Sequence, residues 1–463
     1  MAGIGFVLRR LTRRDDLSGA LQAFTAAAAI TSGPWLLTVL AIAGSGLGTA
    51  LAASPPEYQS FRVILSYDFC FSLVLTAPAT TLASRLVADQ LFAGRVDEIV
   101  PTFLATLAFA LALQMPLALL FWFVPIDLPW PDAAAAVACY AALVALWVTT
   151  AFLSVLRDFG FVLLCFVSGM AVASVGSLWV GQGFGAAGML AWFAIGIALV
   201  GFAGAGRLVA RFPYGALEFR ALAEAARRNR VLLLIGLLSA AAPWADKWVM
   251  WFGPSSERLS SGLHHAPAYD SAMFLSYLAM VPGSAAFFVI AETGFFLSYR
   301  RFFDEVLSGA TLSRIESQRG ELCARIADAG VSLILLQGIV TVTIQLAGPS
   351  LVQAGLLTTM QYPIFRFGVL GAQFHLLLNC LLVVMSYLDL RADQVACALL
   401  FLVLNACLTA GLLPLGFGWD GYGYFLAGLL AFLFAAGLTA SRCRDLIYIA
   451  FIRNNASLRD TRR

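Results

Sequence analysis

The sequence predicts an all-α integral membrane protein with about twelve transmembrane helices in two six-helix bundles. Three observations lead to this prediction: an apolar composition, a series of apolar runs of membrane-spanning length, and an uneven distribution of arginines. Hydrophobic residues make up 61% of the 463-residue chain and charged residues only 12%, whereas a soluble protein carries about 25% charged residues. The chain is therefore expected in a bilayer, where helices satisfy their own backbone hydrogen bonds.

Twelve segments are long enough to cross the hydrocarbon core, which takes about 20 apolar residues. No long alternating pattern typical of β-strands appears among them. The predicted spans cover residues 19–50, 62–86, 100–124, 133–156, 159–180, 186–206, 231–252, 271–296, 330–352, 363–388, 394–416 and 421–441.

Arginine placement orients these spans. With both termini on the cytoplasmic side, 25 of the 28 arginines fall in inner segments, and only Arg62, Arg258 and Arg366 do not. This bias follows the positive-inside rule, so we expect a multi-pass protein with both termini cytoplasmic. Acidic residues gather in the outer loops and predict an acidic outer face; they are Glu57, Asp127, Asp132, Glu257, Asp270 and Asp420.

The spans divide into two halves of six, as in transporters built from repeats. We expect an N-terminal bundle over residues 1–206 that begins with a short amphipathic segment. A cytoplasmic linker covers residues 207–230, and a C-terminal bundle with a cytoplasmic tail covers residues 231–463.

The first span of each half carries the same motif, two small residues followed by Pro-Trp: Pro34-Trp35 and Pro243-Trp244. A proline removes a helical hydrogen bond and bends the helix. Two interpretations are open. Each proline forms a static kink, or Pro34 and Pro243 form a gating bend, with Trp35 and Trp244 offering aromatic faces to sugar rings.

Ionisable residues within apolar spans are candidates for a substrate path, because a buried charge is costly unless it is paired or hydrated. They are Asp68 in the second span, Asp246 and Lys247 in the seventh, and Glu292 in the eighth. Residues at i and i+1 do not face each other on a helix. We therefore expect Asp246 and Lys247 to find partners on other helices or in a hydrated cavity; a structural salt bridge between helices is the alternative.

The tenth span adds Arg366 near its outer end and His375 further along. Arg366 either reaches toward the interface or contacts substrate, and His375 is either a proton carrier or the partner of an interhelical hydrogen bond. Trp248 and Trp251 share a helix face with Trp244, and they form either a carbohydrate path or an interfacial aromatic belt.

Catalytic and cofactor signatures are missing from the sequence. It contains no nucleotide-binding loop, no nucleophile motif, no cluster of metal ligands and no CxxC pair among its eight cysteines. We therefore expect no enzymatic activity, no metal, no cofactor and no nucleic-acid partner. The longest inner loop, residues 298–330, is predicted to form one amphipathic helix that docks a cytoplasmic partner.

Four segments resemble the Pel polysaccharide transporter family (PelG) of the multidrug/oligosaccharidyl-lipid/polysaccharide (MOP) flippase superfamily: MAGIGFVLRRL, SGPWLLTVLAIAG, AETGFFLSYRRFFDEV and FRFGVLGAQFHLLLN. The resemblance covers the whole chain and implies twelve helices in two bundles around a central cavity. It implies export of Pel, an N-acetylgalactosamine-rich, partly cationic biofilm polymer, across the bacterial inner membrane. It also implies a complex with PelD, a cyclic-di-GMP receptor, with PelE and with the cytoplasmic glycosyltransferase PelF.

Three functions follow as hypotheses. In a polysaccharide exporter, Asp68, Asp246 and Glu292 would line a polar cavity, and the acidic outer face would suit a cationic product. The second hypothesis is an ion-coupled flippase or antiporter for lipid-linked glycans or small molecules. The third is a non-transporting scaffold that anchors the glycosyltransferase through residues 207–230 and 298–330. An integral polymerase would need a large outer loop, which the sequence lacks.

Overall fold

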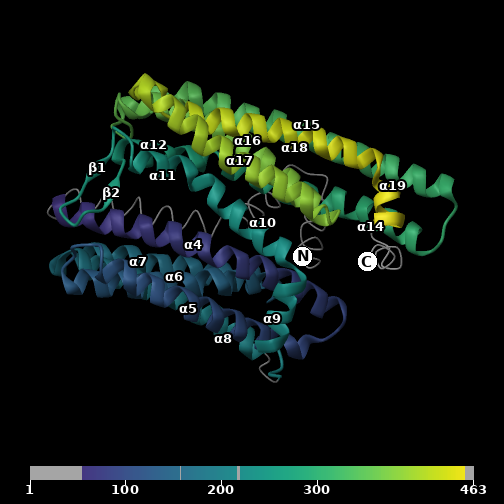
Figure 1. The fold of residues 1–463 in the computed structure, drawn as a ribbon, viewed down its shortest axis with the longest axis horizontal. Coiled ribbons are helices and arrows are strands. Elements are labelled where there is room, and N and C mark those ends of the chain that lie inside the picture. Colours follow the sequence, from purple (N-terminus) through teal and green to yellow (C-terminus); the bar gives the residue numbers. More distant parts are fainter. Residues whose placement is uncertain (1–54, 157, 216–218, 454–463) are drawn as a thin grey trace. The chain divides into compact units, whose positions relative to one another are not determined.

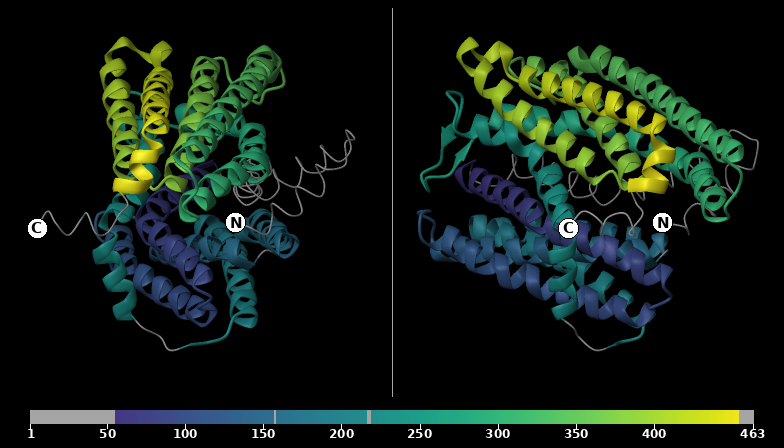
Figure 2. Two further views of the ribbon diagram at one scale, coloured as in Figure 1. Left: turned by 90° about the vertical axis from the view of Figure 1, so that its right-hand side faces the viewer. Right: turned by 45° about the vertical axis from the view of Figure 1, so that its right-hand side comes forward.

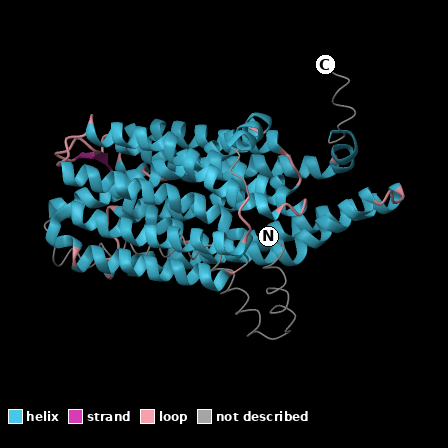
Figure 3. Cartoon of the chain, turned by 90° about the horizontal axis from the view of Figure 1, so that it is seen from below, coloured by secondary structure: helices cyan, strands magenta, loops and turns pink. Residues whose placement is uncertain are grey.

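The computed structural model describes residues 55–156, 158–215 and 219–453 (Figure 1). Over these residues the chain is helical apart from one two-stranded hairpin, as the colouring in Figure 3 shows. Contacts group the chain into two compact units that divide between Asp270 and Ser271. In this part of the chain, eleven helical segments are long and apolar enough to cross a membrane.

The first unit is built from helices α4 to α11. These are α4 (Pro55–Phe92), α5 (Ile99–Phe123), α6 (Trp130–Leu156), α7 (Phe159–Trp179), α8 (Gly185–Arg211), α9 (Phe219–Arg228), α10 (Arg230–Ala241) and α11 (Ala245–Trp251), with 3-10 turns at Val96–Glu98, Gly181–Phe184 and Ala242–Trp244. Helix α8 packs against α6 and α7, and α4 packs against α5, α6 and α10. An antiparallel hairpin of β1 (Glu257–Arg258) and β2 (His264–His265) follows α11.

The contact between α4 and α10 depends on a small residue. A Cβ atom at Gly236 of α10 would lie 2.6 Å from the carbonyl oxygen of Ala77 and 2.6 Å from Oγ1 of Thr81, both on α4. In lipid the hydrophobic effect does not drive helices together, so association depends on such close packing. Glycine at this position therefore sets the distance between the two helices.

The second unit contains most of α12 and the helices that follow it. Their bounds are α12 (Pro267–Leu278), α13 (Met280–Ile290), a π-helical segment (Ala291–Phe295), α14 (Phe296–Leu307), α15 (Leu312–Gln353), α16 (Gln361–Tyr387), α17 (Arg391–Leu412), α18 (Tyr422–Arg444) and α19 (Leu446–Tyr448), with 3-10 turns at Leu413–Leu415 and Phe417–Trp419 and a π-helical end at Ile449–Arg453. Helix α16 packs against α15 and α18, and α18 packs against α17 (Figure 2).

The eighth predicted span is interrupted between α12 and α13. Gln337 of α15 is fully buried, and its Nε2 donates to the carbonyl oxygen of Ala279 at the interruption (2.8 Å). A Cβ atom at Gly283 would clash with Gln337 and Leu376. The interruption near Pro282 is thus fixed by direct contacts with α15 and α16.

The eleven observed spans agree with predicted spans two to twelve. The first predicted span, residues 19–50 with Pro34 and Trp35, lies outside the described residues. The first compact unit continues past the predicted linker to Asp270, and the division into bundles at residues 207–230 stays a prediction.

The prediction of one amphipathic helix over residues 298–330 is wrong. The segment divides between α14 and the start of α15, with a turn in which Gly309 adopts a φ of +68°. Helix α15 has 42 residues and is therefore about 63 Å long, roughly twice the thickness of a hydrocarbon core. Figure 3 shows the α14–α15 turn extending past the other helices of its unit.

Candidate functional site

The seventh predicted span is broken in its middle. Helix α10 ends at Ala241, residues Ala242–Trp244 form a 3-10 turn that contains Pro243, and α11 begins at Ala245. A proline cannot donate a backbone hydrogen bond, and short 3-10 turns are common where α-helical bonding is interrupted. Pro243 therefore lies at a change of helix type, and its role as a gating bend stays a prediction.

Asp246 and Lys247 follow this break and pair with each other. Both are buried, with 0% and 6% of their surface exposed, and Lys247 Nζ lies 3.6 Å from Asp246 Oδ2. The expectation that these neighbours do not pair is therefore wrong. It rests on Cβ directions alone, whereas the long lysine side chain folds back along the helix. Its Nζ also donates to the carbonyl oxygen of Pro243 (3.3 Å) and lies 5.4 Å from the centre of the Trp244 ring.

Two residues at the start of α12 complete this buried polar group. The Tyr269 hydroxyl donates to Asp246 Oδ2 (2.7 Å). Trp251 Nε1 donates to both carboxylate oxygens of Asp270 (3.2 and 3.0 Å), and the amide of Ala266 donates to one of them (3.3 Å). Asp270 is therefore hydrogen-bonded to α11 and half-buried, and its place on an acidic outer face stays a prediction.

The tryptophans of α11 stack on aromatic rings of α4. The Trp251 and Tyr67 rings lie 4.5 Å apart and within 10° of parallel, and the Trp248 and Phe71 rings lie 6.3 Å apart at 7°. Only 2% of Trp251 is exposed, so the interfacial-belt interpretation is wrong for this residue. The Tyr67 hydroxyl also donates to the carbonyl oxygen of His264 (2.8 Å), which ties the outer hairpin to α4.

Asp68 belongs to a second buried polar group of the same unit. It is fully buried in α4, and its Oδ1 accepts a hydrogen bond from Trp122 Nε1 of α5 (3.1 Å). Its Oδ2 has no hydrogen-bond partner among the residues that the structure describes. Asp68 thus lies between helices, and its predicted role as a lining residue stays a prediction.

Polar side chains continue from Asp68 along α4 toward the middle of the unit. Trp147 Nε1 donates to Ser72 Oγ (3.0 Å). Gln114 Nε2 donates to Thr76 Oγ1 (3.0 Å), and Gln114 Oε1 accepts from the hydroxyl of Tyr140 (2.9 Å). These bonds join α4, α5 and α6, and the mid-span position of Gln114 is the sequence signal that could have revealed them.

His375 lies in a buried polar group of the second unit. Its Nδ1 is 2.9 Å from the hydroxyl of Tyr424, which joins α16 to α18. The rings of Tyr277 and Phe401 pack against it. This geometry matches the interhelical hydrogen bond that the sequence left as one of two interpretations.

The remaining candidate path residues are Arg366, Glu292, Trp35 and Pro34. Arg366 is exposed, and its guanidinium lies 5.8 Å from the centre of the Tyr362 ring. The backbone of Glu292 belongs to the π-helical segment Ala291–Phe295, and π-helical turns are frequent at functional sites; the side chain of Glu292 lies outside the described residues. Trp35 and Pro34 also lie outside the described residues.

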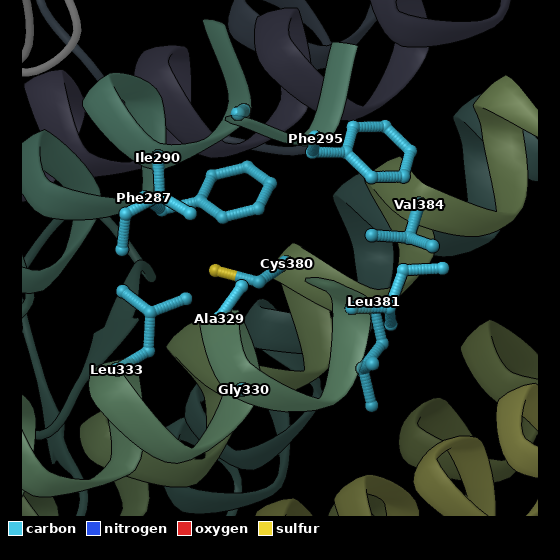
Figure 4. Close-up of a pocket in the computed structure, with 11 residues that line it drawn as sticks. Phe287, Ile290, Phe295, Ala329, Gly330, Leu333, Cys380, Leu381 and Val384 are labelled. Atoms are coloured by element: carbon cyan, nitrogen blue, oxygen red, sulfur yellow. The ribbon is translucent and has the colours of Figure 1, made fainter. Parts of the chain in front are cut away.

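An apolar pocket borders the π-helical segment inside the second unit (Figure 4). It lies between the end of α13, the middle of α15 and α16, with Phe287, Phe295, Leu333 and Cys380 on its walls. These side chains offer no hydrogen-bonding group for a sugar.

At one end of the first unit, an ion pair joins Asp158, which precedes α7 and lies between two candidate spans, to Arg207 near the end of α8. Arg207 donates to Asp158 (2.7 Å), and the amide of Phe161 donates to the same carboxylate (3.4 Å). These two donors hold the pKa of Asp158 below its ordinary value. No group of three His, Cys, Asp or Glu side chains among the described residues could hold a metal ion.

The family comparison decides the assignment. Residues 1–451 match the family described as "PelG: Putative exopolysaccharide Exporter (EPS-E)". This chain belongs to the PelG family of exopolysaccharide exporters. PelG membership confirms the resemblance found in the sequence, and the chain is a transporter and not an enzyme. No curated protein sequence matches it.

Solved structures share the fold of this PelG chain. An outward-facing multidrug resistance MATE family transporter of the MOP superfamily aligns with a TM-score of 0.62 at 16% identity, over 91% of this chain and 96% of that one. An inward-facing one aligns with 0.59 at 15%, over 91% and 99%. A MOP superfamily transporter from Pyrococcus furiosus aligns with 0.57 at 15%, over 91% and 96%. Such identities show the fold alone, and they confirm an all-α, multi-pass, MOP-like fold.

Proposed function

We propose that this PelG-family protein exports Pel, an N-acetylgalactosamine-rich and partly cationic polymer, across the bacterial inner membrane for the biofilm matrix. Family membership supports an exopolysaccharide as the cargo, and the sequence resemblance supports Pel as its identity. The arginine bias supports cytoplasmic termini. PelD, PelE and the glycosyltransferase PelF are the proposed partners, because synthesis and export of a polymer must be coupled.

The observation that carries this proposal is the break between α10 and α11. Transporters place substrate sites at discontinuous helices, and this discontinuity presents Trp244, which is half-buried. Its ring lies beside Lys247 and offers an aromatic face to passing sugar rings. Asp246 and Lys247 then shape the path by holding the break in place. Pro34 and Pro243 are the proposed bends, and Trp35 is the proposed counterpart of Trp244.

The other residues proposed to line the path are far from the α10–α11 break along the chain. Asp68 contributes a buried carboxylate to the first unit, and His375 contributes a buried imidazole to the second. Glu292 and Arg366 are proposed contacts near the two ends of the path in the second half of the chain.

Polymer export at matched membrane abundance tests the proposal. Trp244→Ala is expected to lower surface polymer severalfold, whereas Trp244→Phe keeps an aromatic face and retains most of the export. Trp179→Ala is the matched control, because Trp179 is 80% exposed in the same unit and is expected to leave export unchanged.

Two outcomes would overturn the proposal. Gradient-dependent dye efflux that requires Trp244, with polymer export unaffected, would indicate an ion-coupled antiporter. Normal export in Trp244→Ala combined with its loss on charge reversal in residues 207–230 would indicate a scaffold for the glycosyltransferase.

A further inference from the structure

Helix α9 and the residues around it form a basic surface between two spans. One candidate span ends at Arg211 and the next begins at Arg230, so residues 212–229 start and finish at the same membrane surface. Figure 1 shows α9 running across the ends of the neighbouring spans instead of parallel to them. Helix α9 packs against α4, α5 and α10, which holds it at this level.

The two faces of α9 differ in chemistry. Phe219, Leu222 and Ala226 follow an i, i+3, i+7 pattern on one face, and Arg220 and Arg227 lie on the other. Phe219 is 50% exposed. Helices of this kind lie in the interfacial plane of a membrane, with the apolar face toward acyl chains and arginines toward headgroups.

The net charge of this surface differs from that of the other arginine-rich segment, residues 298–330. Residues 207–230 hold six arginines and two glutamates, which leaves four positive charges. Residues 298–330 hold five arginines and five acidic residues. There, three arginines form ion pairs with acidic side chains of the same segment: Arg300 with Asp304 (3.6 Å), Arg301 with Glu321 (3.5 Å) and Arg314 with Glu305 (2.6 Å).

No described acidic group forms an ion pair with Arg220, Arg227 or Arg230, and all three are exposed. These three arginines are therefore accessible to anions outside the described part of the chain. Phe219, which directly precedes Arg220, is also exposed, and aromatic residues favour the headgroup level of a bilayer. The guanidinium group also matches the geometry of a phosphate.

We propose that α9 and its flanks bind the anionic phospholipid headgroups of the membrane leaflet on which the arginines lie. This binding anchors the connection between α8 and α10 to the membrane surface. It is independent of the cargo, so it can hold or fail whatever the protein exports.

Lipid retention by the purified full-length protein tests this binding. The protein is prepared in a nonionic detergent with equal amounts of phosphatidylglycerol and phosphatidylcholine, and bound lipids are counted by native mass spectrometry. The wild type is expected to retain phosphatidylglycerol preferentially. The triple variant Arg220→Gln, Arg227→Gln and Arg230→Gln is expected to lose this preference, by roughly fivefold for each arginine, which corresponds to about 1 kcal/mol.

Two further variants separate lipid binding from loss of folding. The variant with lysine at the same three positions keeps the charge and is expected to keep most of the preference. The control variant Arg300→Gln, Arg301→Gln and Arg314→Gln removes three arginines that already have acidic partners, and it is expected to retain phosphatidylglycerol like the wild type.

The source of the phosphate is tested separately. Inorganic phosphate at the same concentration is expected not to displace the lipid, because it has no acyl chain to contact the exposed ring of Phe219. Displacement by inorganic phosphate would indicate an anion site without lipid specificity. Equal retention of both lipids by the wild type would show that the protein does not prefer phosphatidylglycerol. An equal loss of phosphatidylglycerol preference in the control variant would show that the arginines of α9 have no special role. Each of these three results would overturn the proposal.

Discussion

Removing one charge of the buried Asp246–Lys247 pair is expected to destabilise the protein, and removing both is expected to restore it. In Asp246→Asn, the Lys247 ammonium stays buried beside the Pro243 carbonyl and the Trp244 ring and loses the carboxylate 3.6 Å away. In Lys247→Met, the Asp246 carboxylate keeps the hydroxyl of Tyr269. Either substitution removes the opposite charge closest to a buried charged group, which costs about 3–5 kcal/mol.

The double variant Asp246→Asn and Lys247→Met buries no charge. An amide oxygen can still accept the Tyr269 hydroxyl, and methionine fills a volume similar to that of the lysine stem. We therefore expect the two substitutions to be strongly non-additive, with an interaction energy that cancels most of the two single losses. For a unit of this size, each single variant should melt about 10 °C below the wild type, and the double variant should recover most of that difference.

Thermal stability of the detergent-solubilised full chain and polymer export are the two measurements, at matched membrane abundance. The exposed pair Arg85 and Asp89 on α4 provides the matched control, because the same cycle there should yield well under about 1 kcal/mol. A double variant as unstable as the worse single variant would refute the pairing argument. If Asp246→Asn abolishes export without lowering the melting temperature, the aspartate contacts cargo or a coupling ion instead.

Three further predictions concern single positions. Gly236→Ala is expected to destabilise the protein by about 1–3 kcal/mol because its Cβ meets α4, whereas Gly206→Ala, with open space around it, should be neutral or slightly stabilising in a thermal melt. Tyr424→Phe removes the hydroxyl next to His375 and should cost about 1 kcal/mol; an unchanged melting temperature would contradict this. The pKa of Asp158 is lowered in the folded state, so its ion pair stabilises the fold above the ordinary aspartate pKa of about 3.9 and loses this effect as the pH falls further. The stability difference between wild type and Asp158→Asn should accordingly be present at pH 6 and shrink toward pH 3, and a difference that grows on acidification would exclude the argument.

The sequence predicts the spans well because hydrophobic length is a local property. All eleven observed spans overlap predicted ones, and each needs only about 20 apolar residues. The internal breaks are also visible locally, since Pro243 and Pro282 lie at or just after the interruptions of their spans. By contrast, the continuity of α15 through residues 312–353 was missed, because its polar first half and apolar second half look like separate elements.

The partners of the buried polar residues could not be predicted, because hydropathy does not say which helices touch. The hydrogen bond from Trp251 to Asp270 crosses from α11 to α12, and in the sequence Asp270 looks like an exposed loop residue. The bond from Trp122 to Asp68 joins residues 54 positions apart. The pairing of Asp246 with Lys247 was missed for another reason, since the helical wheel describes Cβ positions and not the reach of a lysine.

The polar residues of the seventh span are best explained by its break. Pro243 interrupts the α-helical hydrogen bonding, and a broken helix in a membrane is tolerated only where other groups satisfy its backbone. Lys247 donates to the Pro243 carbonyl oxygen, but a buried ammonium needs a counter-charge, which Asp246 supplies. The Tyr269 hydroxyl in turn fixes that carboxylate. Each of these polar groups thus has a hydrogen-bonding or charged partner, and the half-buried aromatic ring of Trp244 is the part of the break that we propose contacts cargo.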